Sequence, residues 1–185
     1  MEFYKQLAWP QVPKELLNQI NFNQKTSIIL NHSKRYFKDN EEIFAPLWAH
    51  ADIESQDLKD WLFENITFPG QNNSFQQLRC QSTHLTHCEM IPHVDMERTY
   101  AFNYYIDTGG ENTYTTWYKE KNQPLIRKVR PPIYKYPTVE GEIDYANLTE
   151  LDKLQVIPNT WYWLRTDVVH GVKNLTGARK YLSIY

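Results

Sequence analysis

The sequence has few cysteines, little net charge and no long apolar run, and each shortage excludes a class of protein. Its two cysteines, Cys80 and Cys88, are too few for a secreted disulfide framework and suit reduced thiols, with a local bridge or soft metal site as the alternative. A formal charge of -2 argues against a protein that coats nucleic acid. No apolar stretch approaches the roughly twenty residues of a membrane span, and Met1 to Lys5 lack the apolar core of a signal peptide. We therefore expect a soluble, cytoplasmic protein.

The length and the aromatic content indicate one folded unit that contains a sheet. The 185 residues have no internal repeat or low-complexity linker, so they suit a single domain over residues 1–185. Thirteen tyrosines and six tryptophans favour half-buried sheet surfaces and a lined cavity over a plain helical bundle.

Helical patterns occur only in the N-terminal third, so residues 1–70 are predicted to be mainly helical support. Pro13 suits the first turn of one helix. Ser55 suits the N-cap of a second helix, in which Leu58 and Leu62 lie on one face.

From Ser74 onward the pattern changes to short strands separated by Gly and Pro, which predicts a barrel or sandwich with helices on one side. Residues 119–147, rich in Pro and Tyr, are predicted to be an insertion between strands. The expected strands are residues 75–83, 99–106, 112–118, 125–129, 154–157, 161–165, 171–174 and 179–185.

A histidine followed two residues later by an acid occurs three times, at His50, His87 and His93. Because about one residue in eight is acidic, chance matches are expected, and the local context must select among the three. His50 lies among helix-forming segments and His87 in a polar connection. Only His93 precedes an apolar, aromatic run with strand character, residues 99–106. His93 with Asp95 is therefore the preferred pair.

Side chains two residues apart on an extended segment point to the same face, so His93 and Asp95 can bind one metal ion. His170, the only histidine after residue 93, would complete two histidines and one carboxylate, an arrangement typical of non-haem Fe(II) oxygenases. The alternative is two structural histidines and a surface carboxylate.

The last predicted strand alternates, which places Arg179 on one face with Tyr181, Ser183 and Tyr185, and Leu182 on the other. A guanidinium facing a core is costly unless it is paired, and a carboxylate ligand fits its planar fork best. An exposed or ion-paired arginine is the alternative interpretation.

Taken in order, these motifs resemble the Fe(II)/2-oxoglutarate-dependent oxygenases of the prolyl-hydroxylase-like branch. The resemblance covers about residues 92–185, half the chain. It implies a double-stranded β-helix, or cupin-like jelly-roll barrel, over residues 74–185. The matching segments are His93-Val94-Asp95, Tyr104-Tyr105-Ile106-Asp107, Gly109-Gly110-Glu111, His170-Gly171-Val172 and Arg179.

The resemblance also implies a role for each site residue. Fe(II) would be bound by His93, Asp95 and His170, and catalysis would proceed through these metal ligands only. The cosubstrate 2-oxoglutarate would be bound by Arg179, Tyr105 and Ser183, although a core tyrosine is the alternative for Tyr105. The remaining residues that line the predicted pocket are Asn103, Val172 and Tyr185.

The implied reaction is hydroxylation of a C–H bond with O2 as oxidant and release of succinate and CO2. A carboxylate at Asp95 predicts oxygenation, because related halogenases have a small residue there. The first barrel strand departs from the family, with Gln81-Ser82-Thr83-His84 where a tyrosine is often found. The insertion has no counterpart, so the substrate could be a peptide, which is slightly favoured, an amino acid or a nucleobase, and the oligomeric state is also open.

Two other functions are compatible with the same residues. A zinc hydrolase could use the three ligands with an activating water in the open position. A non-catalytic jelly-roll protein that binds a metal or ligand would fit the aromatic content equally well.

Overall fold

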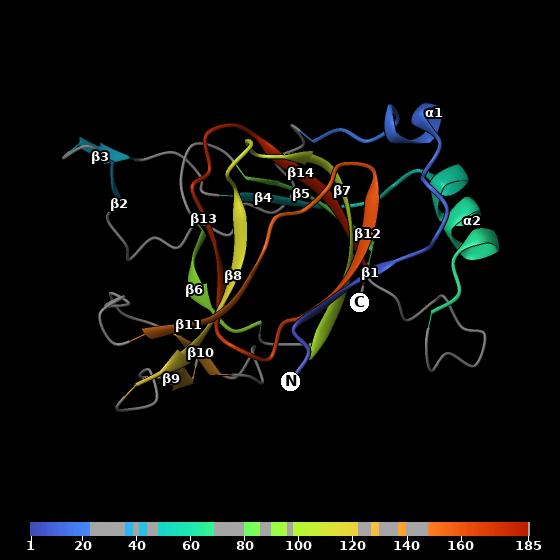
Figure 1. Ribbon diagram of the computed structural model, residues 1–185. Helices are drawn as coiled ribbons and strands as arrows, with labels where there is room; N and C mark the ends of the chain where they lie inside the picture. Colours follow the sequence, from blue (N-terminus) through green and yellow to red (C-terminus); the bar gives the residue numbers. More distant parts are fainter. Residues whose placement is uncertain are drawn as a thin grey trace.

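The computed structural model in Figure 1 is mainly β, with two antiparallel sheets and few helices. It describes residues 1–22, 36–38, 41–43, 48–68, 80–85, 90–95, 98–121, 127–129, 137–139 and 148–184.

The two larger sheets face each other as two layers (Figure 1). The larger, six-stranded sheet has the order β1 (Tyr4–Leu7), β12 (Thr160–Arg165), β7 (Tyr100–Thr108), β14 (Arg179–Ile184), β5 (Cys80–Leu85), β4 (Trp48–Asp52). The smaller, four-stranded sheet has the order β11 (Leu148–Leu154), β8 (Tyr114–Glu120), β13 (His170–Lys173), β6 (Met90–His93). Two separate hairpins are β2 (Tyr36–Lys38) with β3 (Glu41–Ile43), and β9 (Arg127–Val129) with β10 (Pro137–Val139).

From β5 onward the chain moves repeatedly between the two layers. It passes from β5 in the large sheet to β6 in the small sheet, back to β7, and on to β8. After β11 in the small sheet it again alternates, through β12, β13 and β14. Aromatic and aliphatic side chains from both sheets form a cluster that includes Tyr105, Trp117, Tyr162 and Leu164.

The second core lies between the large sheet and the helices α1 (Lys14–Leu17) and α2 (Gln56–Asn65). As predicted, Ser55 is the N-cap of α2, and its hydroxyl accepts a hydrogen bond from the Leu58 N–H at 3.2 Å. Leu58 and Leu62 are fully buried in one cluster with Leu182 of β14. Leu182 therefore faces α2, whereas Tyr181 packs against the cluster between the two sheets. This agrees with the alternation predicted for β14.

The N-terminal third differs from the prediction that it is mainly helical. Among the described residues of this region, helix is confined to α1 and α2, whereas β1 and β4 form the two edges of the large sheet. β1 is four residues long, too short to show a period, and its strand conformation follows from pairing with β12.

Strand β11 was predicted at residues 154–157, and this position is wrong. The strand runs from Leu148 to Leu154, and only its two end residues are buried. Its exposed middle has no apolar alternation that a sequence pattern could show. Of the predicted insertion, residues 119–121 and the hairpin β9–β10 are described, and the rest lies outside the described residues.

No helix in the described ranges has the length and apolar character needed to cross a membrane.

Candidate metal centre

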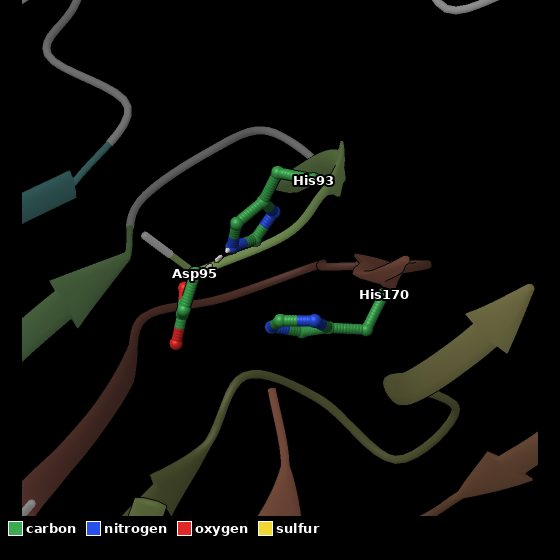
Figure 2. Close-up of side chains that lie close together, drawn as sticks. All are labelled: His93, Asp95 and His170. Carbon is green, nitrogen blue, oxygen red and sulfur yellow. Dashed lines mark ion pairs between the residues drawn. The ribbon is translucent and has the colours of Figure 1, made fainter. Parts of the chain in front are cut away.

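Three side chains meet at one end of the small sheet, two from neighbouring positions and one from a distant part of the sequence. His93, Asp95 and His170 each offer a ligand atom, and these atoms lie within 4.8 Å of one another. Figure 2 shows the three side chains converging from β6, from the segment after it, and from β13. In the part of the chain that the structure describes, this is the group of histidines and acids that could hold a metal ion.

Strand pairing brings the two histidines together. His93 ends β6 and His170 begins β13, and the two are directly paired across the antiparallel ladder. Their ring centroids are 4.5 Å apart, at an angle of 48°. Asp95 follows β6, and its N–H donates to the Thr166 carbonyl at 3.0 Å, which holds the Asp95 backbone beside the segment that leads into β13.

His170 is arranged to present Nε2 as a ligand. Its Nδ1 lies 2.9 Å from the Val168 carbonyl oxygen. Because a carbonyl can only accept, Nδ1 carries the proton and Nε2 keeps a lone pair. Burial, together with the neighbouring His93, lowers the pKa of His170 to about 4, so the ring is neutral at pH 7, as metal ligation requires.

Asp95 is ionised in spite of its partial burial. Burial raises the pKa of its carboxyl, but Arg98 and then the hydrogen bond with His93 outweigh that effect, and the net pKa lies well below the ordinary value. Asp95 Oδ1 is 3.4 Å from His93 Nε2, whereas Oδ2 is 2.6 Å from Arg98 Nε. Two imidazole nitrogens and one carboxylate oxygen suit a divalent transition metal.

Two residues near the centre were not found from the sequence. Arg98 contacts Asp95 and also donates from Nη1 to the Ser183 hydroxyl at 3.2 Å. Thr166, which is 3% exposed, receives the Asp95 N–H, donates its own N–H to the Thr99 carbonyl at 2.9 Å, and donates its hydroxyl to the Arg98 carbonyl at 3.1 Å. Arg98 lies three residues after Asp95, a spacing that could have indicated their ion pair. No feature of the sequence indicated the contacts of Thr166.

Arg179 is a buried cation on the inner face of β14. It is 1% exposed, its Nη2 donates to the Thr115 hydroxyl at 2.9 Å, and its guanidinium carbon lies 4.7 Å from the centre of the Tyr105 ring. Among the described residues, its Nε and Nη1 have no hydrogen-bond partner. Each of these donors would be satisfied by an oxygen of a ligand.

The other predicted site residues lie near these two groups or outside the described chain. Asn103 donates from Nδ2 to the Tyr105 hydroxyl at 3.3 Å, and its Oδ1 has no partner within the described ranges. Val172 is buried and clusters with Leu175. Tyr185 falls outside the described residues. The roles of all these residues stay predictions.

His50 and His87, the other two histidines followed by an acid, were not preferred as metal ligands. His50 lies on strand β4 and not, as predicted, among helices. Its side chain is outside the described part, as are His87 and Cys88. The alternative Cys80–Cys88 pair therefore also stays a prediction.

Comparisons with known proteins do not place the chain in a family. No family model and no curated protein matches it. Among solved structures, one of the DMSP lyases RdDddP and RnDddQII matches with a TM-score of 0.31 and 11% identity, over 59% of this chain and 38% of that one. The X-ray structure of E. coli ycfD matches with a TM-score of 0.34 and 13% identity, over 57% of this chain and 24% of that one. The chain thus spans well under half of either structure, and likenesses this low define neither its family nor its activity.

Proposed function

We propose that this chain is an Fe(II)- and 2-oxoglutarate-dependent dioxygenase that hydroxylates a C–H bond, built on a double-stranded β-helix. The alternation of consecutive strands between two facing antiparallel sheets, from β5 to β14, supports the jelly-roll fold. The prolyl-hydroxylase-like branch and a peptidyl substrate remain predictions from the sequence.

The metal part of the proposal rests on the donor set. His93, Asp95 and His170 come from one end of the small sheet and converge within 4.8 Å. Two histidines and a carboxylate that leave other coordination positions open are typical of non-haem Fe(II) oxygenases. His170 fits this role because its Nδ1 proton is engaged by a backbone carbonyl.

The single observation that favours an oxygenase over other metal proteins is the buried Arg179. A guanidinium with two donor nitrogens unpaired among the described residues is expensive unless a ligand completes its hydrogen bonds. A carboxylate is the best partner for a planar guanidinium fork. We therefore assign Arg179, with Tyr105 and Thr115 beside it, to the distal carboxylate of 2-oxoglutarate.

When bound, Fe(II) and 2-oxoglutarate supply the O2 activation that hydroxylates the substrate and releases succinate and CO2. The chain's own residues bind and orient 2-oxoglutarate. Arg179 neutralises the distal carboxylate, Tyr105 contributes its hydroxyl, and the aromatic cluster around Trp117 keeps bulk water out of the space between the sheets. Ser183 is on the same strand as Arg179, β14, and its hydroxyl accepts a hydrogen bond from Arg98.

The test is anaerobic addition of Fe(II) and 2-oxoglutarate to the purified protein. We expect a visible charge-transfer band that needs both additions, and slow release of succinate when air is admitted. A zinc hydrolase or a non-catalytic metal-binding protein would give neither signal. Absence of the band with Fe(II) bound would exclude 2-oxoglutarate as a chelating ligand and overturn the proposal.

A further inference from the structure

We propose that Arg98 is a positioning residue that makes Asp95 bind the metal through one oxygen only. This inference rests on the proposed function, because it concerns the same metal centre. It assigns a role to a residue that touches a proposed ligand and is not itself a ligand.

The two oxygens of Asp95 have different partners. Oδ2 is 2.6 Å from Arg98 Nε, which is short even for a charge-assisted hydrogen bond. Oδ1 is 3.4 Å from His93 Nε2 and therefore lies on the side of the two imidazoles. One oxygen is thus bound by Arg98, and the other faces the proposed metal position.

Arg98 is fixed at both ends, as a positioning residue must be. Its Nη1 donates to the Ser183 hydroxyl at 3.2 Å, and its backbone carbonyl accepts from the Thr166 hydroxyl at 3.1 Å. Its side chain is 21% exposed, so most of it is packed against neighbours. The guanidinium therefore cannot turn away from Asp95 without breaking the contact with β14.

Binding through one oxygen matters for the proposed reaction. A carboxylate that used both oxygens would occupy an extra coordination position on the metal. Under the proposed function, 2-oxoglutarate and O2 would need the coordination positions that His93, Asp95 and His170 leave open. By holding Oδ2, Arg98 keeps these positions available.

Two effects of Arg98 on metal affinity have opposite signs, which makes the direction of the change informative. Its positive charge repels a divalent cation and competes for Asp95, so removing Arg98 should on this ground tighten metal binding. Its hydrogen bond orients the ligand, and loss of such a partner typically weakens metal affinity about tenfold to a hundredfold. We expect the orienting effect to dominate.

The experiment is titration of the full chain with Co(II), followed by the visible spectrum of the bound ion. In Arg98→Gln we expect Co(II) affinity to fall by about tenfold to a hundredfold and the spectrum to change as Asp95 binds with both oxygens. Arg98→Lys keeps the charge and one donor and should recover part of the affinity. The matched control is Arg165→Gln, because Arg165 forms a similar pair with Asp167, at 2.7 Å, that touches no proposed ligand.

The outcomes separate this inference from the proposed function. If the parent chain bound neither Co(II) nor Fe(II), the metal centre itself would be wrong and the inference with it. If the parent bound Co(II) and Arg98→Gln bound it equally or more tightly with the same spectrum, only the role of Arg98 would be overturned. A purely structural role would lower the urea midpoint of the metal-free protein without altering the Co(II) spectrum. Should Arg98→Gln fail to fold, Arg98→Lys decides by the same two readings.

Discussion

At the scale of single residues, Arg179 has a proposed role in ligand binding and a cost to stability. Its guanidinium is buried at 1% exposure with Nε and Nη1 unpaired among the described residues. Leaving buried donors unsatisfied costs about 1 to 3 kcal/mol. An apolar side chain of similar length would remove that cost, and the proposed carboxylate ligand would account for an arginine at this position.

Arg179→Met should therefore change stability and ligand affinity in opposite directions. Loss of one partner from a buried charged pair costs about 3 to 5 kcal/mol, so 2-oxoglutarate affinity should fall by about two to four orders of magnitude. The unfolding free energy of the ligand-free protein should stay the same or rise. Calorimetric titration and urea unfolding measure the two effects, and unchanged 2-oxoglutarate binding would contradict the assignment.

Tyr105→Phe provides the graded comparison. The ring that lies 4.7 Å from the Arg179 guanidinium is kept, and only the hydroxyl is lost. One hydrogen bond to a charged group is worth about 1.5 to 3 kcal/mol, so the loss of 2-oxoglutarate affinity should be smaller than in Arg179→Met. A loss equal to that of Arg179→Met would mean that Tyr105 acts by positioning the arginine.

Asp95→Ala tests the metal ligands. The side chain is polar and 15% exposed, so its removal should leave the fold intact while Fe(II) affinity falls strongly. Anaerobic titration with Fe(II), accompanied by circular dichroism, measures both. Undiminished iron binding would remove Asp95 from the site and return His50 and His87 to consideration.

At the scale of elements, the connection between β12 and β13 contacts two residues of the proposed metal centre, Asp95 and Arg98, through Thr166. This residue makes three hydrogen bonds to Asp95, Arg98 and Thr99, two of them through its backbone. Its hydroxyl is the only one of the three groups that a side-chain substitution can remove. Through these hydrogen bonds the connection holds the segment after β6 beside the segment that leads into β13.

Thr166→Val keeps the shape and removes the hydroxyl, leaving the Arg98 carbonyl without that donor. We expect unfolding free energy to fall by about 1 to 3 kcal/mol. The matched control is Thr160→Val, which removes a hydroxyl that donates an exposed hydrogen bond to the Pro158 carbonyl and should cost less than about 0.5 kcal/mol. Equal urea midpoints for the two variants would show that Thr166 acts through its backbone alone.

How far the sequence predicts these elements depends on how many apolar side chains each one buries. β12 and β14 bury side chains on both faces of the large sheet, and both were predicted within about a residue. β11 was misplaced because its middle residues are all exposed. β1 and β4 owe their conformation to pairing at the sheet edges, and pairing between distant segments is not visible in a local window.

The same limit applies to the candidate site. The proximity of His93 to Asp95 follows from a period of two, and His170 was found because no other histidine follows. Arg98 lies three residues after Asp95, which the sequence shows, but its contact with Ser183 and the contact of Arg179 with Thr115 each join residues more than sixty positions apart. Tertiary contacts of this kind leave no spacing in the sequence.

At the scale of the whole molecule, the aromatic packing makes stability depend on alkaline pH. Burial raises the pKa of Tyr104, Tyr118 and Tyr162 above the ordinary value of 10. Above that value the unfolded chain loses phenolic protons that the folded chain retains, so unfolding becomes more favourable as pH rises.

We predict that the unfolding free energy is steady between about pH 7 and pH 9 and falls as pH rises past 10, by up to about 1.4 kcal/mol per pH unit for each retained proton. Urea unfolding across this range measures the slope. Tyr104→Phe and Tyr162→Phe should each reduce it, and an unchanged slope in both variants would contradict the assignment.

The position of β14 has a consequence for the order in which the molecule can be assembled. β14 pairs with β5 on one side and β7 on the other, whereas β4 pairs with β5 and β12 with β7. Without β14, the six-stranded sheet falls into two parts that share no backbone hydrogen bond. A chain that ends before Arg179 should therefore remain partly unfolded and bind a dye that reports exposed apolar surface.

During synthesis the last described strand must enter the middle of the sheet. At typical rates of translation, on the order of ten seconds pass between the appearance of Thr108 and that of Ile184. Throughout this interval the open edge of β7 can pair with other chains, because an unpaired strand edge is a template for aggregation. The two ligand-binding groups proposed for β14, Arg179 and Ser183, are therefore added in the same step that closes the sheet, so that no partly made chain has the complete site.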